Sequence, residues 1–231
     1  MYILAHKNHL GRNLMKMLKL FPNDYNFFPH TWLLPSELNE FKKNFDAQGK
    51  SHSAFIFKPE ADCQGRGIFL AKNINKYLKK EQQNYVAQRY LDKPYLIDGL
   101  KFDFRIYILV YGLDPLRIYI FKEGLTRLAT EQYEKPTKKN MKNLFQHLTN
   151  YAINKNNENF QFNDDADNDD VGHKRSFTGV LKQLKSEGVD IDQLMNRVVD
   201  LIIKTVIMVQ PNLAHLYRSC QPDDYENQMV F

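Results

Sequence analysis

Apolar residues recur at helical spacing in several parts of the chain. Over residues 8–20, leucine and methionine return every three or four positions, which predicts an amphipathic helix. Ser36 is a candidate cap for a short helix that runs to about residue 46. Two more helices are expected over about 176–187 and 192–209, and the second collects apolar side chains on one face.

The middle of the chain changes to short apolar runs and alternating patterns, which are typical of β-strands. Turn signals separate the later runs, so we expect an antiparallel meander there. The expected strands are 55–57, 68–70, 85–87, 101–111, 117–121 and 125–129. Residues 21–37, with three prolines and five aromatic residues, predict an irregular connection packed by its rings. A polar helix is expected over 73–84 and a mobile polar loop over 154–170.

Composition narrows the class of protein. The 231 residues are 43% apolar, 26% charged and 13% aromatic, which suits a globular protein and is too aromatic for disorder. Two cysteines, Cys63 and Cys220, exclude a disulfide scaffold and suit a reducing compartment. The longest apolar run, 201–209, is broken by Lys204 and falls short of the ~18 residues of a membrane helix. Sheets and helices in separate runs predict an α+β protein. The cysteine content and the lack of an apolar run of membrane length favour the cytoplasm.

Charge is unevenly placed along the chain. Residues 1–150 carry 24 Lys and Arg against 14 Asp and Glu, whereas residues 151–231 carry 8 against 13. The basic first part could attract nucleic acid, a membrane or any polyanionic partner, and the charge alone does not choose among them. An ordinary lysine-rich surface explains it equally well.

The expected strand 101–111 is the most informative single segment. Side chains alternate between the faces of a strand, so Lys101, Asp103 and Arg105 share one face, followed by Tyr107. The opposite face is apolar. Such a strand can bury its apolar face while the polar face lines a cleft. The alternative is an exposed sheet face with cross-strand ion pairs.

A glycine-containing loop after Lys58 is a second candidate for chemistry. Gly65 and Gly67 would let the backbone approach a ligand, and its N–H groups could cradle phosphate beside the lysine. The spacing fits neither G-x-x-x-x-G-K-[S/T] nor a dinucleotide fingerprint, so a β-hairpin turn remains the alternative. The segments YVAQRYL and HLTNYAINK add polar groups that suit ligand binding, although His147 alone is more typical of a core histidine.

Metal-binding spacings are not met. Asp165, Asp167 and Asp169 have the first spacing of a calcium loop, but Asp170 and Ser176 stand where its glycine and glutamate should be. The cysteines lie far apart in the sequence and H-E-x-x-H does not occur, so no zinc spacing is found.

Taken together, the segments resemble the tubulin tyrosine ligase-like family of ATP-grasp ligases, and within it the branch that adds glutamate. The matching segments are GRNLMKMLKLFP, YNFFPHTWLLPSE, FKPEADCQGRGIF, YVAQRYLDKPYLIDGLKFDFRIYILV, PLRIYIFKEGLTRLAT and HLTNYAINKNNENF. The resemblance implies an ATP-grasp-like α+β fold with mixed or antiparallel sheets, flanking helices and an incomplete C-terminal part. It also implies three regions: 1–53 as the end of an N-terminal region, 54–98 as a central ATP-grasp subdomain, and 99–231 as the C-terminal subdomain.

The resemblance further implies an ATP-dependent reaction on tubulin tails. ATP would phosphorylate a glutamate side chain, and the amine of free L-glutamate would attack the acyl phosphate. Lys58 and Arg105 are the implied catalytic residues. The implied ATP-binding residues, with Mg²⁺ as the accompanying ion, are Lys58, Gln64, Gly65, Arg66, Gly67, Ile68, Gln88, Arg89, Tyr90, Leu91, Lys101, Asp103, Thr149 and Asn150. The implied residues for the incoming glutamate are Arg66, Arg127, Tyr151 and Lys174.

Departures from the family pattern leave two alternatives open. Glu60, Asp62 and Arg89 stand where the family usually has Asp, Gly and Glu. The family's magnesium ligands are expected beyond Phe231, so the chain reads as truncated at both ends and residues 1–231 alone are expected to lack glutamylase activity. The alternatives are a catalytically inactive nucleotide- and microtubule-binding remnant and a tubulin polyglycylase.

The resemblance also sets the expected partners and location. Tubulin or microtubules, through their acidic tails, and free L-glutamate are the expected partners, with no nucleic acid and no membrane. We expect a monomer in the cytoplasm on the microtubule cytoskeleton, including the cilium or basal body.

Overall fold

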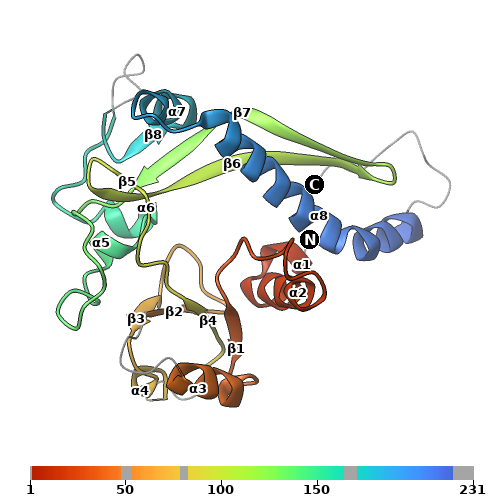
Figure 1. The fold of residues 1–231 in the computed structure, drawn as a ribbon, viewed down its shortest axis with the longest axis horizontal. Helices are drawn as coiled ribbons and strands as arrows, with labels where there is room; N and C mark the ends of the chain where they lie inside the picture. Colours follow the sequence, from red (N-terminus) through yellow and green to blue (C-terminus); the bar gives the residue numbers. More distant parts are fainter. Residues whose placement is uncertain (1, 48–53, 79–82, 164–170, 221–231) are drawn as a thin grey trace. The chain divides into compact units, whose positions relative to one another are not determined.

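The computed structural model describes residues 2–47, 54–78, 83–163 and 171–220. The chain divides into two compact units, each described here by itself. The larger unit comprises residues 5–103 and 127–161, and the smaller unit comprises residues 1–4, 104–126 and 162–231. The architecture is mixed α+β, with two four-stranded sheets and flanking helices (Figure 1), which confirms the α+β class expected from the sequence; the ATP-grasp part of that expectation stays a prediction.

The larger unit contains a sheet with the strand order β1-β4-β2-β3, in which all pairs are antiparallel. The strands are β1 (Thr31–Leu34), β2 (Phe55–Pro59), β3 (Phe69–Ala71) and β4 (Tyr85–Arg89). In the register, Gln88 of β4 lies opposite Thr31 on one side and opposite Ile56 on the other. This row of residues crosses the sheet at the end where the candidate site lies.

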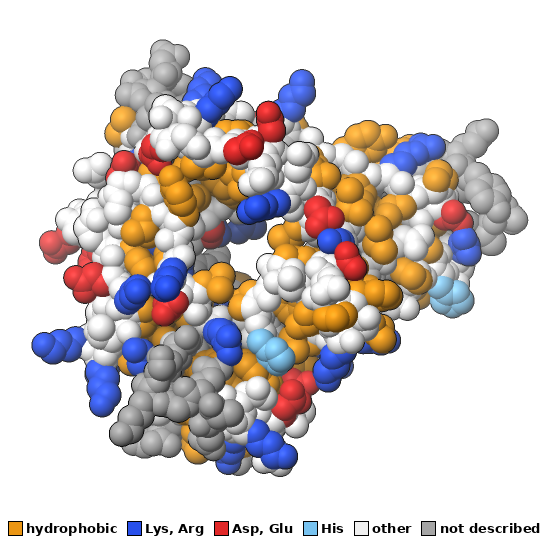
Figure 2. Space-filling model, viewed as in Figure 1, with side chains coloured by type: hydrophobic (Ala, Val, Ile, Leu, Met, Phe, Trp, Pro, Cys, Tyr) orange, Lys and Arg blue, Asp and Glu red, His pale blue; other side chains and the backbone are white. Residues whose placement is uncertain are grey.

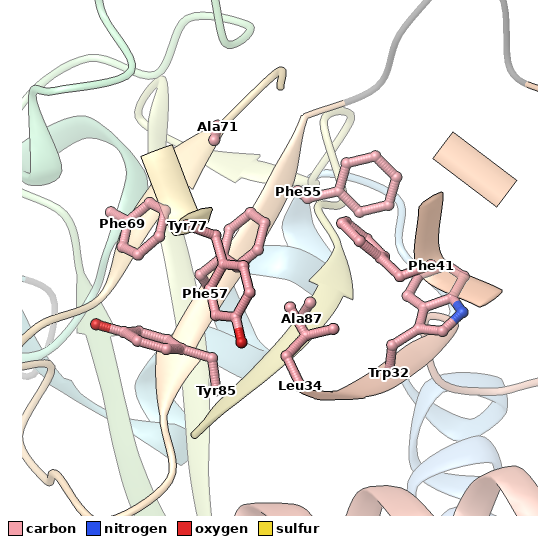
Figure 3. Packing of buried hydrophobic residues seen from close by; sticks show 10 residues of the cluster. All are labelled: Trp32, Leu34, Phe41, Phe55, Phe57, Phe69, Ala71, Tyr77, Tyr85 and Ala87. Carbon is pink, nitrogen blue, oxygen red and sulfur yellow. The ribbon is translucent and has the colours of Figure 1, made fainter. Parts of the chain in front are cut away.

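One face of this sheet is covered by α3 (Leu38–Ala47) and α4 (Asn75–Leu78), and an aromatic cluster fills the space beneath them (Figure 3). Phe57 and Phe69 stack with centroids 4.7 Å apart and planes 3° from parallel. Phe41 of α3 meets Trp32 edge-on at 5.2 Å. Burial of large rings supplies most of the favourable free energy of such a cluster, so this face anchors the sheet.

The opposite face of the same sheet packs against α2 (Lys7–Leu20) and a second apolar cluster. Gly11 allows α2 to approach β1 closely, because a Cβ there would lie 3.0 Å from Thr31 Cγ2. The second cluster joins Ile56 and Leu70 of the strands to Tyr90 and Leu148. Two short helices, α5 (Leu144–His147) and α6 (Tyr151–Asn154), flank Leu148 in the chain, and each packs a side chain against this cluster.

The second sheet has the strand order β5-β6-β7-β8. Its strands are β5 (Leu96–Ile97), β6 (Leu100–Leu113), β7 (Leu116–Leu128) and β8 (Lys174–Ser176). The smaller unit adds α7 (Phe177–Ser186), α8 (Ile191–Cys220) and most of α1 (Tyr2–Ala5). Helix α7 begins where the sequence predicts a helix. Ser176 caps it, because its Oγ accepts from Gly179 N at 2.9 Å. The core of this unit packs α8 against Leu113 of β6.

Three sequence-based expectations about elements are wrong. Residues 117–121 and 125–129 belong to one strand, β7, because Gly124 is a close-approach glycine: a Cβ there would lie 2.4 Å from Arg105 O. The segment expected to be irregular contains β1, whose Trp32 is buried. The last helix continues beyond residue 209 and through Pro211, since packing of its C-terminal half outweighs the cost of the proline.

The helix α8 is longer than the apolar run 201–209 considered from the sequence. An 18-residue window within it has a mean hydropathy of 1.2, so by length and composition alone the helix could cross a membrane. That test is weak evidence, because the core helix of a globular protein passes it as well, and α8 packs through Val209 and Leu213 into the core of the smaller unit. The aspartates Asp164–Asp170 and part of the helix expected over 73–84 lie outside the described residues.

Candidate functional site

Lys58 lies near the end of β2, on the sheet face opposite to the aromatic cluster. Its Nζ donates to Gln88 Oε1 at 2.8 Å, and Gln88 Nε2 donates to Thr31 Oγ1 at 2.9 Å. Burial, and then the charge of Lys7, lower the pKa of Lys58. A partly buried ammonium with a neutral partner and a second cation nearby is an electrostatic environment that favours an anionic ligand.

Lys101, at the start of β6, is a second partly buried cation. Its Nζ donates to the Tyr90 hydroxyl at 3.0 Å and to the His147 carbonyl at 2.9 Å. Burial, and then the charge of Lys58, lower the pKa of Lys101 to about 8, against an opposing contribution from Asp103. The structure therefore brings Lys58 and Lys101, which come from different sheets, into one electrostatic neighbourhood.

Asp103 and Arg127 form a bidentate ion pair between β6 and β7. Arg127 Nε donates to Asp103 Oδ1 at 2.8 Å, and Arg127 Nη2 donates to Asp103 Oδ2 at 2.7 Å. Thr149 Oγ1 donates to the same Oδ2 at 2.7 Å. The pair is partly solvent-accessible, with 37% of the Asp103 side chain and 21% of the Arg127 side chain exposed. Two residues expected to bind different ligands thus hold each other in a fixed plane.

The glycine loop runs from Gln64 to Ile68 and has a left-handed backbone at three positions: φ is +58° at Gln64, +86° at Gly65 and +67° at Gly67. A Cβ on Gly65 would lie 2.5 Å from Ile153 Cδ1 and 3.1 Å from Asn150 Cγ. The backbone at Gly65 therefore lies directly on the HLTNYAINK segment. Arg66 is exposed, and its Nη2 contacts Cys63 Sγ at 3.4 Å.

Residues 88–91 comprise the end of β4, an interior strand of the first sheet, and the two residues after it. The backbone N–H of Arg89 donates to His30 O at 3.1 Å, and that of Tyr90 donates to Ala54 O at 2.9 Å. Both N–H groups are hydrogen-bonded within the protein. An adenine base bound by this segment would therefore use its other backbone groups. The side chains of Arg89 and Leu91 are exposed, whereas the Tyr90 ring is buried.

The remaining expected site residues are more dispersed. Asn150 precedes α6 as its N-terminal flanking residue, and Tyr151 is exposed with its ring 5.7 Å from that of Phe160. Arg105 and Lys174 are exposed residues of the smaller unit. Their approach to the residues of the larger unit stays a prediction.

A cavity of about 130 Å³ lies beside Lys58 and Gln88, between α2 and the sheet. Its lining residues are Lys7, Leu10, Gly11, Leu14, Thr31, Lys58, Val86 and Gln88. Lys7 also donates to Pro59 O at 2.8 Å and to Asp62 O, which ties the start of α2 to the chain that leads into the glycine loop. Sequence reasoning missed both Lys7 and Thr31, because neither has a local pattern that indicates a role; only the strand register and the helix packing place them here.

Basic side chains do not by themselves mark the site. Figure 2 shows Lys and Arg side chains spread over the visible face with Asp and Glu interspersed. Among the described residues, no group of three His, Cys, Asp or Glu side chains is placed to hold a metal ion. The features that distinguish the site are the two partly buried lysines, the positive-φ loop and the Asp103–Arg127 pair.

A comparison with known protein families now gives the class. The tubulin-tyrosine ligase family matches residues 1–227. The chain therefore belongs to this family, which confirms the resemblance noted from its motifs.

Individual relatives narrow the class further. A probable beta-tubulin polyglutamylase of Tetrahymena thermophila is 56% identical over 231 residues, which are 100% of this chain and 19% of that protein. Tubulin polyglutamylase ttll6 of Danio rerio is 40% identical over 99% of this chain and 28% of that protein. Tubulin polyglutamylase TTLL13 of Mus musculus is 43% identical over 95% of this chain and 26% of that protein. The chain thus spans 19% to 28% of the length of these three curated relatives.

Proposed function

We propose that this chain carries the nucleotide-binding part of an ATP-dependent ligase that adds glutamate to glutamate side chains of tubulin tails. Membership of the tubulin-tyrosine ligase family and relatives named tubulin polyglutamylases support the ligase class and the tubulin substrate. The observation that carries the nucleotide assignment is the pair of partly buried lysines, Lys58 and Lys101, whose pKa values are both lowered. A polyphosphate is the ligand class that such a pair suits best.

The proposed reaction has two chemical steps. In the first, an oxygen of the acceptor carboxylate forms a bond to the γ-phosphorus of ATP, and the bond from that phosphorus to the bridging oxygen of ADP breaks. In the second, the amine of free L-glutamate attacks the carbonyl carbon of the acyl phosphate and loses a proton. The carbon–oxygen bond to phosphate then breaks, which leaves an isopeptide bond, ADP and inorganic phosphate.

Electrostatic stabilisation is the main task of the protein in these steps, since both substrates and the intermediate are anionic. Lys58 and Lys101 would neutralise phosphate oxygens, and the glycine loop would cover them with backbone N–H groups. Arg105 would face the transferred phosphoryl group. Asp103, Thr149 and Asn150 would complete the nucleotide site, while Arg66, Arg127, Tyr151 and Lys174 would hold the incoming glutamate.

The proposal includes an ATP-grasp arrangement, in which residues 54–98 and 99–231 contribute two parts that enclose the nucleotide. Mg²⁺ accompanies ATP in the proposal. The acidic residues in the described part of the chain do not form a cluster that fits this ion, so no step above is assigned to it. The proposed location is the cytoplasmic microtubule cytoskeleton, where tubulin tails are available.

Two measurements test the proposal. Titration calorimetry of residues 1–231 with ATP tests the nucleotide site, and saturable binding at one site is the expected result. Transfer is assayed with the product of the complete natural reading frame, microtubules, ATP, and radiolabelled glutamate or glycine in parallel. Label from glutamate on tubulin supports the proposal. Label from glycine would assign a polyglycylase, and ATP binding without transfer of either amino acid would assign a nucleotide-binding remnant.

A further inference from the structure

We propose that Tyr90 and His147 are positioning residues, which hold the Lys101 ammonium so that one of its N–H bonds is left for the nucleotide. This inference rests on the proposed function for the role of Lys101, but the contacts that carry it lie within the larger unit. It gives side-chain roles to a tyrosine that was expected to act through its backbone and to a histidine expected to be structural.

Counting hydrogens assigns a direction to each contact of Lys101. A lysine ammonium has three N–H donors and no acceptor. Two donors of Lys101 go to the Tyr90 hydroxyl, at 3.0 Å, and to the His147 carbonyl, at 2.9 Å. One donor remains. The Tyr90 hydroxyl also lies 3.3 Å from His147 Nδ1, so it links that ring to the Lys101 ammonium.

The surroundings of His147 favour its neutral form. The Tyr90 hydroxyl and His147 Nδ1 lie 3.3 Å apart, and the tautomer of the ring decides which of them donates. Burial, and then the charge of Lys101, lower the pKa of His147, against a smaller opposing contribution from the Asn140 backbone. A neutral ring beside a cation is the consistent arrangement, since a second positive charge there would repel Lys101.

Packing keeps these groups in place. The His147 side chain is fully buried, and its ring meets the rings of Tyr90 and Tyr133 edge-on, with centroids 5.8 and 5.9 Å away. The Lys101 Nζ lies 4.4 Å from the centroid of the Tyr90 ring, so the ring also stabilises the ammonium as a cation–π partner. A lysine held by two fixed acceptors loses less conformational freedom when a ligand binds.

The charged and titratable groups around Lys101 come from several elements. Lys58 of β2 repels its ammonium and Asp103 of β6 attracts it. Burial, then the charge of Tyr133, a hydrogen bond with Tyr133 and the charge of Asp92 raise the pKa of the Tyr90 hydroxyl, so Tyr90 keeps its proton. Removal of the Tyr90 hydroxyl takes away one acceptor of the charged ammonium while these other groups remain.

The test measures the protonation of Lys101 directly. Residues 1–231 are acylated briefly with acetic anhydride across a pH series, and mass spectrometry gives the pH midpoint of Lys101 labelling without any nucleotide. In Tyr90→Phe the midpoint is expected to fall by about one unit, because a hydrogen bond to the charged form is lost. His147→Asn, whose side-chain amide can replace Nδ1 as the hydrogen-bond partner of Tyr90, should stay near the wild-type midpoint, and His147→Leu should shift in the direction of Tyr90→Phe.

A matched control separates positioning from general loss of packing. Tyr77→Phe also removes a buried hydroxyl with a hydrogen bond, 3.3 Å to Gln83 O, but on the opposite face of the sheet. Its midpoint should not move. An unchanged midpoint in Tyr90→Phe, or an equal shift in Tyr77→Phe, would overturn the inference.

Nucleotide affinity completes the experiment. Tyr90→Phe should weaken ATP binding by about tenfold by calorimetry. In a Lys101→Met background the same change should have less than about a twofold effect, because its partner is gone. Equal effects in both backgrounds would contradict the positioning role. If the wild-type chain bound no ATP, the proposed function would fail, while the labelling midpoints would still decide whether Tyr90 and His147 hold Lys101.

Discussion

Replacement of Lys58 by methionine is the sharpest test of the nucleotide site. Methionine keeps an unbranched apolar side chain of similar length but removes the charge that the proposal assigns to phosphate binding. Lys58→Met is expected to weaken ATP binding and, at the same time, to leave the fold equally or more stable. Opposite effects on binding and stability would distinguish a functional cation from a structural one.

The magnitude follows from the surroundings of the ammonium. A charge-assisted hydrogen bond contributes ~1.5–3 kcal/mol, so its loss should weaken ATP binding by roughly 10- to 150-fold. Lys58→Met removes a charge that burial and repulsion by Lys7 both disfavour, which stabilises the fold. The substitution also removes the 2.8 Å hydrogen bond from Lys58 to Gln88, which destabilises it. The Gln88 side chain keeps its bond to Thr31, so this loss is expected to be no larger than the gain, and the net stability should be unchanged or higher.

Calorimetry with ATP and urea unfolding measure the two effects on residues 1–231. Lys43→Met, on the exposed surface of α3, is the matched control, because it makes the same chemical change outside the site. Labelling of Lys101 gives a third readout: without Lys58, which lowers the pKa of Lys101, the labelling midpoint should rise. Unchanged ATP affinity in Lys58→Met, or an equal loss in Lys43→Met, would refute the assignment of Lys58.

Three further predictions use other parts of the larger unit. Gly65→Ala should lower both stability in urea unfolding and ATP affinity in calorimetry, since φ is +86° and its Cβ would lie 2.5 Å from Ile153 Cδ1. The control Gly188→Ala, at φ +89° with nothing within 4 Å, should show the stability cost of backbone strain alone and normal ATP affinity. ATP affinity should fall as pH rises through about 8, where Lys101 loses its proton. The free energy of unfolding should instead rise from about 8 to 10.5, because the unfolded chain binds more protons there; flat profiles in both measurements would contradict the low pKa. Phe57→Ala should cost about 3–5 kcal/mol in urea unfolding, and a loss below about 1 kcal/mol would show that the aromatic cluster does not anchor the sheet.

The sequence predicted local elements well wherever one face of the element is buried. The helix over 8–20 and the strands around Phe57 and Lys101 have clear apolar periods, and the structure has α2, β2 and β6 there. Prediction failed where a tertiary contact overrides a local signal. Gly124 looks like a turn residue in the sequence, but it is required within β7 because the Arg105 backbone passes too close for a Cβ.

For the candidate site, the sequence indicated which residues matter better than it indicated what each one touches. The alternation along β6 correctly placed Lys101 and Asp103 together, but the bidentate contact of Asp103 with Arg127 depends on the register of β6 and β7, which no local pattern encodes. The contact of Lys101 with His147 has the same origin. It joins residues 46 positions apart, through a backbone carbonyl that is available whatever side chain the residue has.

The two partly buried lysines give the strongest physical reason to expect an anionic ligand at this site. Each burial opposes the charged form, and Lys58 further destabilises the charge on Lys101. Folding alone would be better served by apolar side chains of similar size at both positions, because they would fill the space without the desolvation cost. An anion placed between the two ammonium groups reverses the sign of the interaction: it raises both pKa values and recovers in binding the free energy that folding gives up. The same electrostatics makes phosphate a better ligand than a neutral amide or a sugar, since only a charged group can offset two positive charges in a desolvated site.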